Sequence, residues 1–314
     1  MPAACSLVAD IGGTNTRVAL ARGETLDPGS VRRYANRQAT DLAGILHRYL
    51  DETGTERGRV TGVCVAAAGP VRDGVADLTN LAWRVDHTTL ARVLTAQKVA
   101  VLNDLQAQGY AISRLAPGMQ KVVKPGPEQP PAARRLVVGI GTGFNAAPVH
   151  TTGTGRVVPP SECGHITLPV RDRESAHLAR ALQERHGFAA VEDALSGRGI
   201  GAIHRTLHKT GLCAAEVMAA LEAGDPSAEA TAALFVRLLG HVLGDLALIH
   251  LPFGGLYLVG GVSRAFTPHL NRFGLAEAMR DKGRFGPFLD QFGVSVIIDD
   301  YAALTGCATH LAHL

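Results

Sequence analysis

Cysteine is scarce in this sequence of 314 residues, and its arrangement argues against two common kinds of structural support. The five cysteines are an odd number at wide spacing, and no two of them form a C-x-x-C pair. A disulfide framework uses an even set of cysteines, and a structural zinc site uses closely paired ligands. We therefore expect neither kind of site, and we expect a reducing, cytoplasmic setting.

Long basic tracts are also missing. The chain has 31 Lys and Arg residues against 28 Asp and Glu residues, a net charge of +3, and its basic residues cluster only in short pairs such as Arg134-Arg135. Proteins that bind nucleic acid usually concentrate basic charge in a patch. The sequence therefore predicts no nucleic-acid partner.

No uncharged apolar run reaches the length that a membrane span requires, which is about 20 residues. The nearest candidate, residues 234–251, is interrupted by Arg237 and Asp245. The first five residues lack the basic stretch and apolar core of a secretory signal. We therefore expect no membrane partner.

Aromatic residues make up only 5% of the chain, whereas hydrophobic residues make up 46%. Short segments rich in Val, Leu and Ile alternate with longer helix-like segments, which is typical of an α/β fold. The length favours two domains. The expected strands are 7–11, 60–66, 99–102, 136–140, 256–259 and 294–298. The expected helices include 41–50, 88–96, 174–185, 228–250 and 301–312.

One pattern occurs twice, about half a chain apart. Residues 7–14 form an apolar strand that leads into a glycine-rich turn ending in Thr14, and residues 136–143 repeat the strand, the turn and the threonine. The repetition predicts two related domains that face one another.

The first of these turns contains Asp10, Gly12, Gly13, Thr14 and Asn15. Glycines allow backbone N–H groups to converge on an anion, and the threonine adds a hydroxyl. The aspartate could hold Mg²⁺ through water, because this ion gives up its water reluctantly. A plain β-hairpin is the structural alternative; the surrounding polar residues and the second turn favour phosphate binding.

The second turn, residues 139–145, partly matches the dinucleotide fingerprint G-x-G-x-x-G. Phe144 occupies the third glycine position, although Glu162 lies about where a ribose-binding acid would be expected. Residues 146–150 have the pattern of a strand, whereas the fingerprint requires a helix there. A phosphate-binding hairpin fits better, and its candidate ligands are Gly141, Thr142 and Gly143.

Asn103 and Asp104 follow an apolar strand directly. A carboxylate at the end of a strand can accept a proton from a substrate hydroxyl. The structural alternative is a helix cap, since residues 105–112 have a helical pattern.

Three further polar residues could bind a sugar. Glu162 and His165 lie three residues apart around a glycine, so one loop could direct both toward a ligand as acceptor and donor. Glu192 is a weaker candidate, because a carboxylate at a helix start would look the same. Near the end of the chain, Gly260 and Gly261 follow a strand and could pack against a nucleobase, or could only form a tight turn.

Two other segments have structural interpretations. Residues 124–131 are rich in proline and are expected to form a surface loop between two strands of one domain. Arg237, His241 and Asp245 are spaced four apart in the expected helix 228–250, and we interpret them as a solvated stripe rather than a site.

In this order the motifs resemble the bacterial glucokinase family of the actin-like ATPase superfamily, over nearly the whole chain. The single motifs are moderately specific, and their ordered set is highly specific. The segments that carry the resemblance are 10–17, 68–70, 78–80 with Trp83, 102–104, 141–143, 162–165, 192–197, 260–261 and 281–285.

The resemblance implies two actin-like (ribonuclease H-like) α/β domains flanking a deep cleft. The small domain would comprise residues 1–107 plus 301–314, and the large domain residues 108–300. The implied substrates are ATP with Mg²⁺ and a hexose, most simply glucose, and the implied assembly is a homodimer.

The resemblance also implies a role for each matched residue. Asp104 would be the catalytic base. The sugar would be bound by Asn80, Asn103, Asp104, Glu162, His165 and Glu192. The nucleotide and its metal would be bound by Asp10, Gly12, Gly13, Thr14, Asn15, Gly141, Thr142, Gly143, Gly260 and Gly261, with Asp10 toward the metal.

Three residues depart from the family pattern. Phe144 and Asn145 stand where the family usually has Leu-Gly, and Cys163 stands where it usually has glycine. Asn tolerates the left-handed backbone that glycine often supplies, so phosphate binding is expected to survive. The bulkier Phe144 and the thiol beside Glu162 leave the identity of the sugar open. The alternatives are a kinase for fructose, mannose or an amino sugar, and a non-catalytic nucleotide-binding switch.

Overall fold

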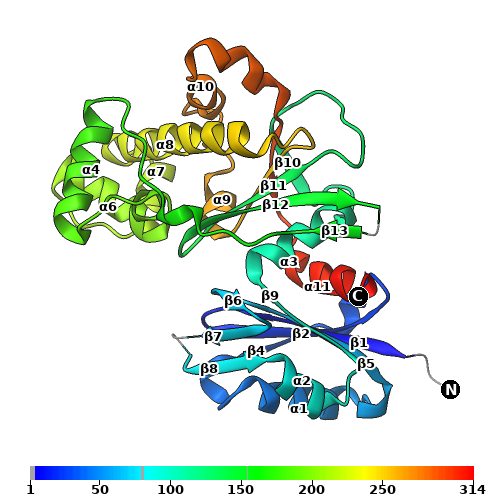
Figure 1. Ribbon diagram of the computed structural model, residues 1–314. Coiled ribbons are helices and arrows are strands. Elements are labelled where there is room, and N and C mark those ends of the chain that lie inside the picture. Colours follow the sequence, from blue (N-terminus) through cyan, green and yellow to red (C-terminus); the bar gives the residue numbers. More distant parts are fainter. Residues whose placement is uncertain (1–3, 79–80, 154) are drawn as a thin grey trace. The chain divides into compact units, whose positions relative to one another are not determined.

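The computed structural model describes residues 4–78, 81–153 and 155–314 (Figure 1). The chain forms two compact units. The first extends to Ala116 and also contains residues 152–158 and 299–314; the second contains residues 117–151 and 159–298. We describe each unit separately.

The first unit is built on a mixed sheet with the order β3-β2-β1-β5-β9, in which β1, β5 and β9 are parallel and β4 also pairs with β2. A small antiparallel sheet, β6-β7-β8, accompanies it. The strands are β1 (Cys5–Ile11), β2 (Asn15–Arg22), β3 (Thr25–Leu26), β4 (Arg32–Ala35), β5 (Val60–Ala67), β6 (Val71–Arg72), β7 (Val75–Leu78), β8 (Trp83–Asp86) and β9 (Lys98–Asn103), with β13 (Gly155–Val157) in the added segment. The helices are α1 (Leu42–Thr53), α2 (His87–Leu94), α3 (Asp104–Ala111) and α11 (Ala302–Ala312).

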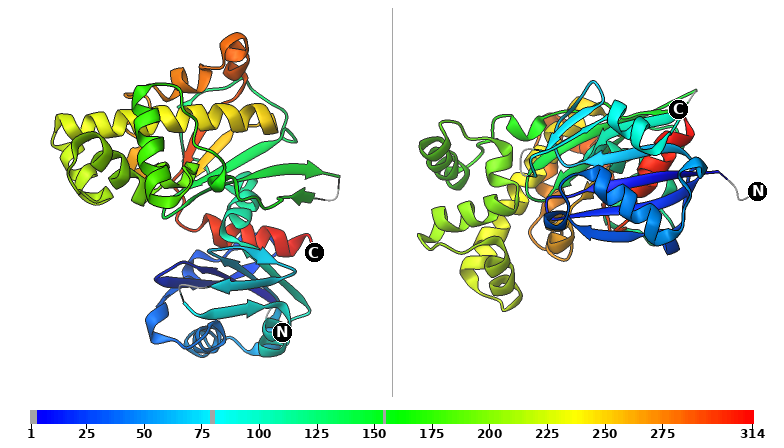
Figure 2. Two further views of the ribbon diagram at one scale, coloured as in Figure 1. Left: turned by 60° about the vertical axis from the view of Figure 1, so that its left-hand side comes forward. Right: turned by 90° about the horizontal axis from the view of Figure 1, so that it is seen from below.

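Helices cover both faces of this sheet. In the views of Figures 1 and 2, α1 and α2 lie on one face, and α3 lies beside the C-terminal α11 on the other. The sequence sets the helix ends locally: the Asp41 side chain accepts a hydrogen bond from Gly44 N at 2.8 Å and begins α1, and Gly54 ends it in the left-handed conformation. The core between the sheet and α1 contains the fully buried side chains of Leu7, Leu46 and Tyr49.

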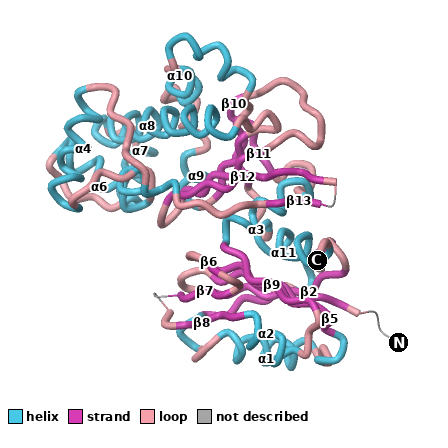
Figure 3. Tube along the Cα trace, viewed as in Figure 1, coloured by secondary structure: helices cyan, strands magenta, loops and turns pink. Residues whose placement is uncertain are grey.

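The second unit is built on a sheet with the strand order β10-β15-β14-β11-β12. Its neighbouring strands β11 and β14 are parallel. The strands are β10 (Gln120–Lys124), β11 (Arg135–Ile140), β12 (Phe144–Thr152), β14 (Leu256–Val259) and β15 (Val294–Ile297). The helices are α4 (Arg173–His186), α5 (Val191–Ala194), α6 (Gly197–His208), α7 (Ala214–Glu222), α8 (Pro226–His250), α9 (Gly261–Phe266) and α10 (Leu275–Arg280). The expected strands, helices and α/β class are confirmed, as is the proline-rich loop, which joins β10 to β11 (Figure 3).

The long helix α8 is the centre of the second unit. Among the described helices it alone is long and apolar enough to cross a membrane. However, 72% of its most apolar 18-residue stretch is buried inside the protein. Asp225 caps it, because its carboxylate oxygen accepts a hydrogen bond from Ala228 N at 3.0 Å, and Pro226 occupies its first turn. Its burial identifies α8 as a core helix of this unit.

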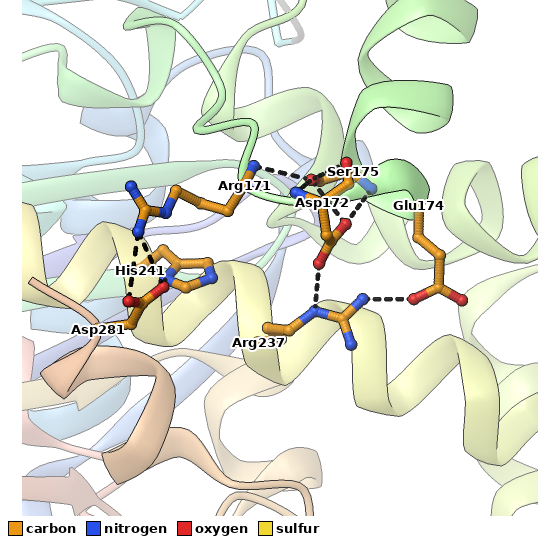
Figure 4. A network of polar contacts seen from close by, with 7 residues as sticks. All are labelled: Arg171, Asp172, Glu174, Ser175, Arg237, His241 and Asp281. Atoms are coloured by element: carbon orange, nitrogen blue, oxygen red, sulfur yellow. Dashed lines mark hydrogen bonds and ion pairs between the residues drawn. The ribbon is translucent and has the colours of Figure 1, made fainter.

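The prediction of a solvated stripe on this helix is wrong in part (Figure 4). Arg237 and Asp245 are partly exposed, but His241 is only 4% exposed. Arg237 pairs with Asp172 at 3.0 Å at the start of α4, and Lys282 donates to the carbonyl of His241 at 3.0 Å. Four-residue spacing correctly placed the three on one side of the helix, but it could not show that other segments cover that side.

A half-buried histidine should give the first unit a pH-dependent stability. The His310 ring on α11 packs against Tyr110 on α3 at a centroid distance of 4.5 Å. Burial, and secondarily the nearby His313, lowers the pKa of His310 to about 4. The folded protein therefore binds this proton only near pH 4, whereas the unfolded chain binds it near pH 6.5. Stability from this group is complete above pH 6.5 and is lost as the pH falls toward 4.

Replacement of His310 with Gln should therefore flatten the loss of stability between pH 6.5 and 4. The wild-type free energy of unfolding should fall over this range by up to about 3 kcal/mol from this group alone. Urea unfolding at several pH values measures the effect, with the exposed His87 replaced by Gln as the control. A variant with the same slope as the wild type would show that His310 does not set the pH dependence.

Candidate active site

The residues predicted to bind nucleotide or sugar fall into two groups, one in each unit. In the first unit, Ile11 pairs with Ala67, and Ala67 pairs with Asn103, so β1, β5 and β9 end at the same edge of the sheet. The turn after β1 and the start of α3 therefore share this edge. Sequence spacing alone could not show this, since about 90 residues separate them.

The first glycine turn is a tight connection between β1 and β2. Gly12 N donates to Asn15 O at 3.0 Å, which closes the hairpin. Asn36 supports the turn from outside: its Nδ2 donates to Gly12 O at 2.8 Å, and its Oδ1 accepts from Thr16 Oγ1 at 2.8 Å. Asn36 is 3% exposed and was not predicted from the sequence, because nothing in its local pattern links it to Gly12, 24 residues earlier.

Asp10 lies at the end of β1, beside this turn. Burial raises the pKa of its carboxyl, and Arg17, at 3.8 Å from Oδ2, opposes the rise. Arg17 also donates to Asp300 O at 3.1 Å. A partly buried carboxylate with one distant cation as counter-charge suits a hydrated divalent ion. In the described part of the chain, no three His, Cys, Asp or Glu residues form a metal cluster of their own.

A helix cap was the alternative role for Asp104, but the residue that caps α3 is Asn103. Asn103 is the cap: its Oδ1 accepts from Gln106 N at 2.7 Å, and Gln106 Oε1 accepts from Asn103 N at 3.1 Å. Asp104 is the first helical residue and is exposed, with Oδ1 accepting from Leu105 N at 2.8 Å. The cap therefore fixes the residue immediately before the predicted base. Asn80, the other sugar-binding candidate of this unit, lies outside the described residues.

In the second unit, the turn after β11 is held by residues far along the chain. Gly141 N donates to Gly143 O at 2.9 Å, and Gly141 O accepts from Gly197 N at 2.8 Å at the start of α6. Glu192 reaches the same turn, since its Oε2 accepts from Phe144 N at 3.0 Å. A Cβ at Gly143 would lie 3.1 Å from the carboxyl carbon of Glu192, so a side chain at position 143 would displace this carboxylate.

Glu192 also pairs with Arg198 through Oε1, and Arg198 was not predicted. Both carboxylate oxygens of Glu192 therefore have partners in the turn or on α6. The only sequence signal for Arg198 was its position directly after the matched segment 192–197.

The loop that carries Glu162 and His165 lies against the same turn. It forms a short 3₁₀ helix, η5 (Cys163–His165), and both predicted side chains are exposed. A Cβ at Gly164 would overlap the carbonyl oxygen of Phe144 and lie 3.4 Å from Glu192 Cβ. The structure thus brings together Glu162, His165, Glu192 and the second glycine turn.

Gly260 completes this group at the end of β14. Its φ of +100° favours glycine, and a Cβ there would lie 2.9 Å from the carbonyl carbon of Ile140 at the end of β11. Gly261 begins α9. Because β11 and β14 are parallel neighbours, the two glycine turns that follow them lie at one edge of the sheet.

One expectation about the departures from the family pattern is wrong, and the structure also shows where Phe144 lies. Asn145 does not supply a left-handed backbone: it lies within β12, and its φ is not positive. Phe144 is only 3% exposed and packs in the core of the unit, so its bulk lies away from solvent.

Comparison with known proteins identifies the family. The family model described as Glucokinase matches residues 7–314. The chain belongs to the glucokinase family. A glucokinase from Pseudomonas aeruginosa (strain LESB58) is 34% identical over 315 residues, which cover 97% of this chain and 94% of the relative.

Solved structures agree with this assignment. The crystal structure of a glucokinase from an Antarctic psychrotroph is 28% identical, with a TM-score of 0.88 and 99% coverage of both chains. The glucokinase of Balamuthia mandrillaris, solved in complex with glucose, has a TM-score of 0.80 at 22% identity over 99% of this chain and 94% of that one. The second likeness concerns the fold. The resemblance to bacterial glucokinases is confirmed; the roles of individual residues stay predictions.

Proposed function

We propose that this chain transfers the terminal phosphoryl group of ATP to the 6-hydroxyl of glucose, giving glucose 6-phosphate and ADP. Membership of the glucokinase family carries the proposal. The local geometry supports it, because in each unit a glycine turn follows the carboxyl end of a strand that has a parallel neighbour. We place the reaction in the cytoplasm, where ATP is available.

In this proposal the residues predicted from the family resemblance carry the reaction. Asp104 accepts the proton of the 6-hydroxyl while that oxygen forms a bond to the γ-phosphorus, and the bond from phosphorus to the β,γ-bridging oxygen breaks. The electron pair of that bond leaves with ADP. Glu162, His165, Glu192 and Asn103 hold the sugar hydroxyls, so that the reacting oxygen is oriented before transfer.

The turns containing Thr14 and Thr142 would hold the phosphates through backbone N–H groups and hydroxyls. Asp10 would hold Mg²⁺ through water, which agrees with its partly buried carboxyl and with Arg17 as a counter-charge 3.8 Å away. When bound, Mg²⁺ neutralises charge on the phosphates during transfer.

A second candidate function is a kinase for another hexose. Asn145 and Cys163 are both departures from the family pattern; Cys163 directly follows Glu162, and Asn145 accepts a hydrogen bond from Cys163 N. This contact places the sequence differences next to a predicted sugar ligand. An amino sugar, mannose or fructose could then be the better substrate.

An ADP-release assay with glucose, mannose, fructose and glucosamine separates these functions. We expect glucose to give the highest kcat/KM. An epimer that breaks a carboxylate contact should have a kcat/KM about 10²–10⁴-fold lower, because it leaves a polar group of the site without its partner. A higher kcat/KM for another sugar would establish the second candidate. ADP release that is slow and indifferent to every sugar would indicate a nucleotide-binding switch instead.

A further inference from the structure

Asn145 and Cys163 are 18 residues apart, yet the two departures from the family pattern contact each other. Cys163 N donates to Asn145 Oδ1 at 3.1 Å, and Cys163 Sγ lies 3.5 Å from the same oxygen. Burial raises the pKa of the Cys163 thiol, so the neutral S–H donor is favoured at neutral pH. The two differences therefore form one local structure.

The Asn145 side chain also binds the residue on the other side of Glu162. Asn145 Nδ2 donates to Ser161 O, and Ser161 Oγ lies 3.1 Å from Asn145 Oδ1. The Ser161 hydroxyl donates to Ala146 O at 2.6 Å. Both neighbours of Glu162 are thus tied to the start of β12 by one amide side chain.

The Asn145 side chain is itself held in one orientation. Asn145 Oδ1 accepts from Ala146 N at 2.8 Å, and the Asn145 backbone is a strand residue opposite Gly139. Glu162, between the two tied residues, is exposed and carries no capping hydrogen bond from its side chain. Its position therefore depends on its backbone, which Asn145 binds on both sides, at Ser161 and at Cys163.

We propose that Asn145 is a positioning residue for sugar binding, which fixes the backbone that presents Glu162 and thereby sets affinity and selectivity for the hexose. The inference rests on the proposed function. A glycine at position 145 could make none of these side-chain contacts, so chains with the usual family pattern must hold this loop by other means. Cys163 contributes mainly its backbone N–H.

Replacement of Asn145 with Ala should raise KM for glucose about 10- to 100-fold, because a displacement of about 1 Å in a substrate-binding group can have an effect of this size. KM for ATP should change less than about twofold. The ratio of kcat/KM for glucose to that for mannose should fall at least about threefold. Cys163→Ala, which keeps the backbone N–H, should stay within about twofold of the wild type.

A double-mutant cycle tests whether Asn145 acts through Glu162. Glu162→Gln should raise KM for glucose strongly in the wild-type background. In the Asn145→Ala background, the factor by which it raises KM should be at least about fivefold smaller. A residue that only stabilises the fold would give additive effects. Asn271→Ala is the matched control, since Asn271 Nδ2 also binds a backbone carbonyl, Val123 O at 3.0 Å, at the opposite edge strand β10.

The outcomes separate this inference from the proposed function. If the wild type phosphorylates no sugar, the proposed function fails. If the wild type is active but the cycle is additive, or if KM for glucose is unchanged in folded Asn145→Ala, the positioning role is wrong. Thermal unfolding of each variant identifies loss of fold. If Asn145→Ala proves unstable, Asn145→Asp replaces it in the test. This variant keeps Oδ1 but lacks the donor to Ser161 O, so its KM for glucose should be intermediate.

Discussion

Asp104→Asn should lower kcat for glucose phosphorylation by about 10²–10⁴-fold, the usual contribution of a general base. The amide cannot accept the proton of the sugar hydroxyl at neutral pH. Its carbonyl oxygen can still accept the hydrogen bond from Leu105 N, which Asp104 Oδ1 accepts at 2.8 Å, so α3 should keep its first turn. The affinity for glucose, measured by isothermal titration, should therefore change less than about threefold.

Asp86→Asn is the matched control for this variant. Asp86 also stands between a strand and a helix of the first unit, and its Oδ1 accepts from Thr89 N at 2.8 Å as the cap of α2. Its replacement changes a cap but no predicted catalytic group, so kcat should stay within about twofold of the wild type. Turnover by Asp104→Asn at a rate close to that of the control would remove Asp104 from the role of base.

The strand at residues 99–102 and the polar pair after it could be predicted from the sequence, but the division of roles within the pair could not. Both Asn and Asp favour helix caps, and the pattern gave no reason to prefer one. The structure shows Asn103 as the cap, with Gln106 completing a reciprocal capping pair, and Asp104 exposed beside it. A predicted sugar ligand therefore has a structural hydrogen bond of its own.

Long-range partners set the limit of the sequence prediction. The glycine turns, Glu162 and Glu192 could be named from local pattern and family resemblance, because each lies in a short motif. The groups that hold them, such as Asn36 for the first turn, belong to other segments and have no motif of their own. Asn145 shows the same limit: a backbone role was inferred from its neighbours in sequence, and a side-chain role emerged from its neighbours in space.

A glycine on α11 leads to the largest expected effect on stability. Gly306 lies where α11 crosses α3, and a Cβ there would overlap the carbonyl oxygen of Ala107 and lie 2.6 Å from its carbonyl carbon. It would also lie 3.2 Å from Ala111 N, so backbone on two successive turns of α3 obstructs it. Backbone cannot give way as a flexible side chain can, so the helices must move apart.

Gly306→Ala should therefore destabilise the first unit by about 3 kcal/mol, the upper part of the usual range for overpacking. Alanine has the higher helix propensity, which offsets at most about 1 kcal/mol. The apparent melting temperature should fall by about 6–12 °C, given about 2–4 °C per kcal/mol. Circular dichroism and calorimetry measure both quantities.

Gly44→Ala provides the control, because Gly44 is exposed in the first turn of α1 and a Cβ there would meet only Asp41 Oδ1 at 3.5 Å. This variant should be as stable as the wild type or up to about 1 kcal/mol more stable. Equal stability of the two variants would mean that α3 and α11 are not in close contact at Gly306. Since Asp104 begins α3 and Ala107 lies one turn further along, a displaced α3 should also lower kcat in Gly306→Ala at temperatures where the variant is still folded.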